Sequence, residues 1–385
     1  MIVRPLTEYC TLNMGQSPDS KTYNTQGKGL PFYQGNADFG ETHPITHVWC
    51  SAPVKVAEDG DILISVRAPI GAMNMAVERC CIGRGLAALT PIRNKCSKQF
   101  LYYALQSKVD SLIAQGTGST FKAISKKVLE ATCIPAYSTI EQEQIAETIG
   151  HVDNTISARR KQLALLDQLV KSRFIELFGM PGTDAFGWGL VPLGSTCNIN
   201  PKKSLDSRLV SGAMVSFVPM PAVTEHGEID ATAIKEYDEV KTGFTYFAEN
   251  DVLFAKITPC MENGKGAVAK GLHNGIGFGS TEFHVLRPIS GKTDPYWIYT
   301  LTAFSQFRMD AASNMTGSAG QRRVPASFLE NYRVSLPPIA LQEQFAAFVE
   351  QTDKSKYYSS LSFRYCQAAA NTYRQEWMTC RTSDF

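Results

Sequence analysis

The chain has 385 residues, of which 44% are hydrophobic and 19% are charged, and its formal net charge is +2. This composition is typical of a globular protein large enough for two domains, and it argues against disordered and membrane-spanning classes. The small net charge disfavours a protein that coats nucleic acid indiscriminately, but it allows a local basic surface that meets phosphates. Ten cysteines without a CxxC pair, and no apolar leader, predict a cytoplasmic protein with reduced thiols.

Residues 1–137 are expected to form a first domain of mixed α and β structure. Bulky apolar residues at 62–66 predict a strand between Gly60 and Pro69, and a second apolar run covers residues 86–89. Residues 100–105 predict a short helix. The strands are too short, and the turns too frequent, for a doubly wound parallel sheet.

A long helix is predicted over residues 138–179. Ser138 and Glu141 have the spacing of a capping box, in which each side chain pairs with a free backbone amide. At ~1.5 Å per residue, residues 140–177 would span roughly 57 Å. An amphipathic helix lying on its own domain is the alternative. The apolar stripe recurs in steps of three and four, at Ile149, Val152, Ile156, Leu163, Leu166, Val170 and Leu177.

Residues 180–338 repeat the first domain, and residues 339–385 supply a second helix and a tail. Residues 252–254 repeat the strand, and residues 296–301 repeat the short helix. Apolar residues mark the second long helix only as far as Val349, so its later turns are predicted weakly. The matching pairs keep the same order, at Pro5 and Pro192, Asp61 and Asp251, Pro91 and Pro288, Gly118 and Gly317, and Gln142 and Gln342.

Several stretches resemble the specificity subunits of Type I restriction–modification systems. These are residues 14–18 (MGQSP), 251–265 (DVLFAKITPCMENGK) and 316–323 (TGSAGQRR), together with Pro337-Pro338 ahead of Gln342-Glu343-Gln344. The resemblance covers nearly the whole chain. It implies an α+β fold with two similar mixed α/β target recognition domains, each reading one half of a bipartite DNA target. It also implies that the long helix after each domain pairs with the other as an antiparallel coiled coil.

The resemblance further implies partners for the chain. They are double-stranded DNA, the methyltransferase (M) subunits and the restriction (R) subunits, and no membrane is expected. S-adenosylmethionine, ATP and Mg are expected on those partner subunits, with no cofactor and no metal bound by this chain. The helical stripe is expected to dock the methyltransferase subunits through Ile149, Val152, Ile156, Leu163, Leu166 and Val170.

Motifs for catalysis are missing. Asn200-Pro201-Lys202 and Asp294-Pro295-Tyr296 lack the second proline of a base-methylation loop, and no phosphate-cradling glycine loop occurs. Asp238 with Glu239-Val240-Lys241 matches a nuclease pattern by letters alone, and a solvated charged surface is the simpler interpretation. His43, His47 and Cys50 lack a fourth zinc ligand, and Pro44 breaks the helix that would align the two histidines. A non-catalytic chain is therefore expected.

The expected chemistry is that of base edges and phosphates. Arg and Lys read guanine, Gln and Asn read adenine, and hydroxyl groups hold phosphates. Taken singly, each candidate is more simply a solvated side chain, and the strongest pair is Arg322-Arg323. The matched loop of the first copy carries only Lys122, so the two halves should read different bases. The candidates are Gln16, Ser17, Lys21, Lys28, Gln34, Asn36, Arg67, Arg84, Ser119, Thr120, Lys122, Lys202, Lys203, Lys241, Lys256, Lys265, Gln321, Arg322 and Arg323.

Two other function classes stay open at this point. One is a single-chain modification enzyme or nuclease with an unrecognised active site, which the missing methylation loop argues against. The other is a duplicated protein-interaction scaffold, which the basic, glycine-punctuated loops argue against.

Overall fold

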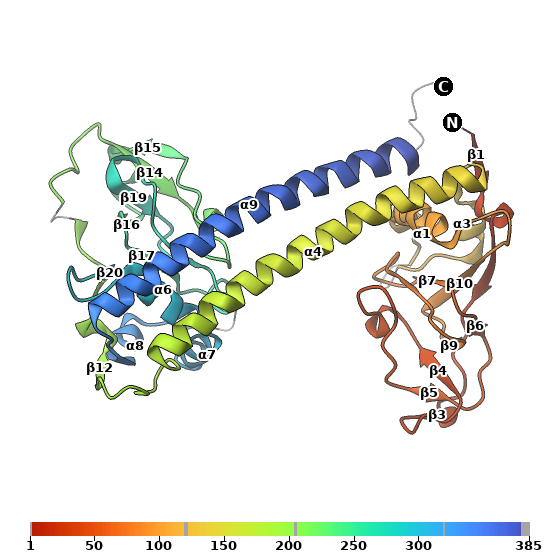
Figure 1. Cartoon of the computed structure of the whole chain (residues 1–385), viewed down its shortest axis with the longest axis horizontal. Helices are drawn as coiled ribbons and strands as arrows, with labels where there is room; N and C mark the ends of the chain where they lie inside the picture. Colours follow the sequence, from red (N-terminus) through yellow and green to blue (C-terminus); the bar gives the residue numbers. More distant parts are fainter. Residues whose placement is uncertain (1, 119–121, 204–205, 319, 379–385) are drawn as a thin grey trace. The chain divides into compact units, whose positions relative to one another are not determined.

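The computed structural model describes residues 2–118, 122–203, 206–318 and 320–378, and Figure 1 labels its elements. The chain divides into two compact units. The first unit is Met1–Arg160 with Leu361–Phe385, and the second is Lys161–Ser360. In the described part of the chain, no helix is long and apolar enough to cross a membrane.

The first unit is built around two sheets. The central sheet is antiparallel, in the order β2 (Cys10–Met14), β10 (Leu86–Pro91), β7 (Ile62–Ser65), β8 (Met73–Met75). β7 and β10 confirm the strands predicted from the two apolar runs. The other sheet is mixed, in the order β3 (Tyr23–Asn24), β5 (Trp49–Cys50), β4 (Leu30–Tyr33), β9 (Cys80–Ile82), β6 (Val56–Ala57).

Helices cover the central sheet of the first unit. α1 (Lys98–Gln106) confirms the predicted short helix, and Phe100 and Leu101 on it are fully buried against strand residues such as Ile62. α2 (Val109–Ala114) and α3 (Lys126–Ala131) follow. A separate pair of strands, β1 (Val3–Pro5) and β11 (Cys133–Pro135), joins the two ends of the domain.

The second unit repeats this plan. Its central sheet has the order β13 (Cys197–Ile199), β20 (Phe283–Pro288), β17 (Val252–Ala255), β18 (Gly266–Val268), and β12 (Leu190–Pro192) pairs with β21 (Arg333–Ser335). Its other sheet has the order β15 (Ile234–Glu236), β14 (Met214–Val218), β19 (Ile276–Gly279), β16 (Thr245–Ala248). The helices are α5 (Tyr237–Val240), α6 (Pro295–Ala303), α7 (Ser305–Ser313) and α8 (Ala326–Asn331).

The repeated Gly/Asn–Asp sequence is the turn that leads into β7 in the first central sheet and β17 in the second. Gly60 has φ +82° and Asn250 has φ +68°, a left-handed conformation that glycine and asparagine tolerate best. The aspartate after it accepts a backbone hydrogen bond in both copies, from Glu58 N to Asp61 and from Ala248 N to Asp251, each 2.8 Å long. The copies therefore share local geometry as well as sequence.

The two long helices are α4 (Thr139–Phe178) and α9 (Ile339–Met378), each of 40 residues. The capping box of α4 is confirmed, because Ser138 N donates to Glu141 Oε2 at 2.8 Å and Glu141 N to Ser138 Oγ at 3.3 Å. The predicted second long helix is confirmed, and α9 continues for 29 residues beyond Val349 although its sequence there lacks a leucine seam.

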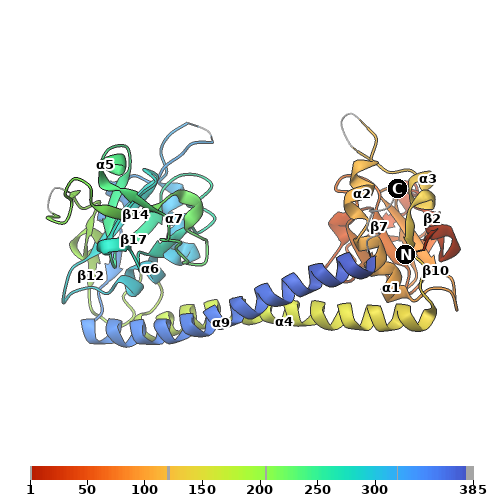
Figure 2. The same cartoon turned by 90° about the horizontal axis from the view of Figure 1, so that it is seen from above.

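Within each unit the two helices run antiparallel (Figures 1 and 2). In the second unit, Lys356 Nζ lies 2.8 Å from Asp167, and the rings of Phe174 and Phe345 are 5.5 Å apart. In the first unit, Arg374 Nη2 lies 2.5 Å from Asp153. Cross-helix ion pairs thus support the later turns of α9, where Leu361 is the one leucine beyond Val349.

The predicted docking stripe on α4 faces the interior. Ile149 is 1% exposed in the core of the first unit, and Val170 is 7% exposed in the core of the second. Ile156 is also buried, while Val152, Leu163 and Leu166 are half-buried. The prediction of a partner surface is therefore wrong for Ile149, Ile156 and Val170. Ile149 packs in the core of the first unit, as the alternative of a helix lying on its own domain expects, whereas Val170 packs in the core of the second unit.

The repeated Gln-Glu-Gln sequence joins each long helix to its domain. Gln142 and Gln342 are both fully buried. Gln142 Oε1 accepts from Ser97 N at 3.0 Å, and its Nε2 donates to the carbonyls of Lys95 and Tyr137 at 3.0 Å. The equivalent partners of Gln342 are Asp294 N at 2.9 Å, Lys292 O at 3.1 Å and Pro337 O at 2.8 Å.

Candidate nucleic-acid interface

Four short stretches of chain form the same backbone arrangement in both units. We call it the first platform (residues 66–68, 85, 117–118 and 122–124) and the second platform (256–258, 282, 316–318 and 320–324). Five hydrogen bonds recur at nearly equal lengths. The matched donor–acceptor pairs are Val66–Gly85 and Lys256–Glu282 (2.9 and 2.9 Å), Ile124–Val66 and Val324–Lys256 (2.9 and 2.9 Å), Thr117–Ala123 and Thr316–Arg323 (3.0 and 3.0 Å), Ala123–Thr117 and Arg323–Thr316 (2.9 and 2.8 Å), and Ala68–Lys122 and Thr258–Arg322 (3.1 and 3.0 Å).

The platforms gather several of the predicted DNA-contacting side chains. The first platform presents Arg67 and Lys122, both exposed. The second carries Lys256 and the run from Gln321 to Arg323, in which Gln321 and Arg322 are exposed. Ser119 and Thr120, also predicted contacts, lie outside the described residues. A shared backbone thus displays different side chains in the two units.

The cations of the two platforms differ in their ion pairs. In the second, Arg323 binds Glu282 with nitrogen–oxygen distances of 2.9 Å from Nε and 2.8 Å from Nη2. Hydrogen bonding to Arg323 lowers the pKa of Glu282, and burial lowers the pKa of Lys256 beside this pair. Arg322 lies 3.9 Å from Glu262. For Arg67 and Lys122, the described part of the first unit shows no ion pair.

Four more predicted residues of the first unit lie around the turn at residues 83–85, beside the first platform. Gln16 N donates to Ile82 O at 3.1 Å, and Arg84 N donates to Ser17 Oγ at 3.3 Å. At Gly85 a Cβ would lie 2.3 Å from the carbonyl oxygen of Gln34, so only glycine fits there. Gln16, Ser17, Gln34 and Arg84 therefore adjoin the platform that contains Gly85.

Other predicted residues lie elsewhere or are already engaged. Lys21 is exposed in the 3-10 helix Ser20–Thr22 before β3, and Lys28 is exposed in the loop after β3. Asn36 is half-buried in the 3-10 helix Asn36–Asp38 after β4. Lys203 Nζ donates to the carbonyl of Lys241. The remaining candidates of this group, Lys202 and Lys241, are exposed.

Lys265 corrects one prediction. Its side chain is 18% exposed, and Nζ donates to Val223 O at 3.1 Å and lies 3.9 Å from Glu225. The ammonium group therefore holds its own unit together, and the prediction that it contacts DNA is wrong.

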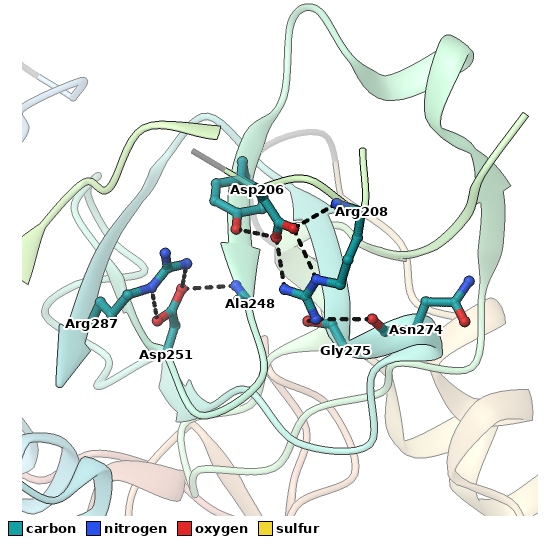
Figure 3. Close-up of polar contacts among 8 residues, drawn as sticks. Asp206, Arg208, Ala248, Asp251, Asn274, Gly275 and Arg287 are labelled. Carbon is teal, nitrogen blue, oxygen red and sulfur yellow. Dashed lines mark hydrogen bonds and ion pairs between the residues drawn. The ribbon is translucent and has the colours of Figure 1, made fainter. Parts of the chain in front are cut away.

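A polar network surrounds Asp206 and Arg208 (Figure 3). Asp206 accepts from Arg208 Nη2 and from the Tyr246 hydroxyl, both at 2.7 Å, and these bonds hold the pKa of the Asp206 carboxyl far below its usual range. Arg208 Nη1 donates to Asn274 O at 3.1 Å. Every charged group in this network is paired, so the network anchors the loop to the sheet and offers no free acid or base.

Sequence reasoning missed Arg308, a buried arginine on α7 that is 6% exposed. Eleven residues separate Phe254 from Gly266, whereas eight separate Ile64 from Met73 at the equivalent register of the first unit. Arg308 donates into this longer loop, to Met261 O at 3.0 Å and Gly264 O at 3.3 Å. An arginine within a helix is usually a surface residue, so its sequence gave no signal of this role.

His284 is also buried, beside the second platform. Its Nε2 donates to Val324 O at 2.8 Å, and its Nδ1 lies 3.0 Å from the Asn200 amide nitrogen, so the neutral ring fits both contacts. Desolvation lowers the pKa of His284. The equivalent position of the first copy is Ala87.

A pH dependence follows from His284. Because the folded-state pKa lies below the unfolded value of 6.5, the unfolded chain binds the extra proton first as the pH falls. The stabilisation should be complete above pH 6.5 and should decline below it. We expect the difference in free energy of unfolding between wild type and His284→Ala to shrink from pH 7.5 to pH 5, measured by urea denaturation. A difference that stays constant would contradict this assignment.

The excluded zinc site can be checked against the geometry. His43 Nδ1 is 2.9 Å from Met75 O, and Cys50 is fully buried. Among the described residues, no group of three or more His, Cys, Asp or Glu side chains is placed to hold a metal ion.

Comparisons with known proteins agree with the duplicated fold. The family model of the Type I restriction modification DNA specificity domain matches residues 1–168 and 187–357. The putative type I restriction enzyme MjaX specificity subunit of Methanocaldococcus jannaschii is 41% identical over 164 residues, which are 43% of this chain and 39% of that protein. The type I restriction enzyme EcoEI specificity subunit of Escherichia coli is 43% identical over 153 residues, 40% of this chain and 25% of that protein. The matched segments thus span well under half of either relative.

A solved structure matches nearly the whole chain. The crystal structure of the Type I restriction–modification system S subunit from M. genitalium has a TM-score of 0.60 at 15% sequence identity, covering 99% of this chain and 96% of that one. At this identity the match shows a shared fold.

Proposed function

Because the chain belongs to the family of Type I restriction modification DNA specificity domains, we propose that it is a non-catalytic, sequence-specific DNA-recognition subunit. Each unit reads one half of a bipartite target. The observation that carries this proposal is the pair of platforms, which share five backbone hydrogen bonds and differ in their side chains. A backbone frame shared by the two copies, with different polar groups on each, is the arrangement expected of two readers with different targets.

The side chains on the platforms support base and phosphate contacts. Arg67 and Lys122 in the first unit are exposed cations suited to phosphates or guanine. In the second unit, the exposed Gln321 can pair with adenine, and Arg322 and Arg323 with guanine. Because the sets differ, the two half-sites should differ in sequence.

We also propose that catalysis belongs to partner subunits. Methyltransferase subunits would bind S-adenosylmethionine, restriction subunits would use ATP and Mg, and this chain would bind none of these. The exposed apolar side chains of the long helices supply candidate docking surfaces for the methyltransferase, in place of the buried stripe. They are Leu165, Leu169, Tyr357 and Tyr358 in the second unit, and Leu361 and Tyr365 in the first.

Substitution on one platform tests whether each unit reads its half-site independently of the other. We expect Gln321→Ala with Arg322→Ala to reduce the preference for the specified bases of one half-site, by ~1–3 kcal/mol of binding free energy per lost base contact. The preference at the other half-site should stay intact. The matched variant is Lys122→Ala on the first platform, which should affect only the opposite half-site. The readout is sequencing of duplexes that the full chain selects from a randomised pool. Equal loss at both half-sites from either variant would contradict independent reading.

A further inference from the structure

We propose that Arg323 reads a guanine in the half-site of the second unit, and that Glu282 is the positioning residue that aims its guanidinium. The inference rests on the DNA-recognition function proposed above. It assigns the guanine contact to Arg323 in particular, and it adds a positioning residue, Glu282, that the sequence did not single out.

The Arg323 guanidinium is held along one edge. Nε donates to Glu282 Oε2 at 2.9 Å and Nη2 donates to Oε1 at 2.8 Å, a bidentate contact. On another side, Nη1 donates to Gln321 O at 3.3 Å. These contacts fix the plane of the group, although the side chain is 42% exposed.

The remaining donors match guanine. A guanidinium has five N–H donors, and the contacts above use three, so one N–H on Nη1 and one on Nη2 are left for a ligand. Two parallel N–H donors on a fixed arginine are the group that binds O6 and N7 of guanine in the major groove. A phosphate suits this site less well, because its charge would lie near the Glu282 carboxylate.

The backbone also holds Glu282 in place. Lys256 N donates to Glu282 O at 2.9 Å, and Glu282 N donates to Ser280 Oγ at 3.2 Å. The Glu282 side chain is only 24% exposed, so the carboxylate has little freedom to leave the arginine. The orientation of Arg323 is thus set before any ligand binds, which lowers the cost of binding.

The first copy lacks both members of the pair. The matched hydrogen bonds of the platforms place Ala123 where Arg323 stands and Gly85 where Glu282 stands. A side chain at residue 85 would collide with the carbonyl of Gln34. Both residues of the pair are present in the second unit, and both are absent from the first. This fits a contact that serves one half-site and is not part of the backbone arrangement shared by the platforms.

The test uses the full chain and a randomised pool of duplex DNA, with sequencing of the bound fraction and a separate affinity measurement on non-selected duplex. Arg323→Lys keeps the positive charge but removes the two parallel N–H donors of the guanidinium. Glu282→Gln keeps the shape and removes the charge that orients the arginine. The matched control is Glu239→Gln, which removes an equal charge from a carboxylate 3.9 Å from Lys235, away from the platform. Thermal unfolding of each variant checks its fold.

We expect Arg323→Lys to lower the preference for guanine at one position of one half-site by about tenfold or more. Glu282→Gln should lower the guanine preference at the same position, while its affinity for non-selected duplex stays equal or rises. Simple misfolding would not give this combination. Glu239→Gln should change neither. Two results would overturn the inference in favour of a phosphate contact. One is a guanine preference that Arg323→Lys retains. The other is a Glu282→Gln variant that binds all sequences more tightly and keeps its guanine preference at that position. If the wild-type chain selects no sequence, the proposed function itself fails.

Discussion

Replacing Gln342 with leucine is expected to lower the free energy of unfolding of the second unit by about 3–5 kcal/mol. The Gln342 side chain is fully buried and hydrogen-bonds Asp294 N, Lys292 O and Pro337 O. Leucine has a similar volume but pairs with none of them. Each buried backbone group left without a partner costs ~1–3 kcal/mol. The loss of these three hydrogen bonds should therefore destabilise the packing of α9 against its domain.

The matched control lies two residues further along the same motif. Gln344 is exposed, so Gln344→Leu should change stability by no more than about 0.5 kcal/mol. Gln142→Leu should reproduce the large loss in the first unit. Urea denaturation of the full-length variants measures all three. Equal stability of Gln342→Leu and Gln344→Leu would show that the buried contacts contribute nothing.

The second large effect is expected at Arg308. Substitution by methionine preserves much of the volume and removes all donors to the carbonyls of Met261, Gly264, Lys265 and Thr302. Burial lowers the pKa of Arg308 to about 10, which leaves the side chain charged at neutral pH and dependent on these carbonyls. We expect a loss of about 3–5 kcal/mol, because several buried acceptors lose a charged donor together.

Hydrogen exchange locates this effect. The amides of residues 261–266 should exchange faster in Arg308→Met, while those of the first unit keep their protection. Arg322→Met, at an exposed arginine of the same unit, is the stability control and should change unfolding by less than about 0.5 kcal/mol. Unchanged exchange in residues 261–266 would show that the loop is held by other contacts.

Local signals in the sequence predicted much of the fold. The apolar runs predicted β7 and β10, and the Ser138–Glu141 spacing predicted the start of α4. These features depend on neighbours within a few residues, so their chemistry can be read from sequence. The repeated Gln-Glu-Gln is visible as a sequence pattern, but the burial of Gln142 and Gln342 depends on contacts with segments about 50 residues away and has no local signal.

The site was harder to predict because distant segments assemble it. Residues 66, 85 and 123 meet only through the sheet, and the Glu282–Arg323 contact joins residues 41 positions apart. The direction of the α4 stripe also depends on what packs against it. For the same reason the sequence predicts a surface cation at Lys265, whereas its ammonium group is engaged inside the unit.

The measurement that tests the central claim most directly is selection of duplex DNA from a randomised pool by the wild-type chain. If the two units read DNA independently, we expect two short blocks of specified and unlike sequence in the selected duplexes. A stretch of fixed length, in which every base is accepted, should separate them. A single continuous block, or no enriched sequence, would contradict the account of two platforms as separate readers of one bipartite target.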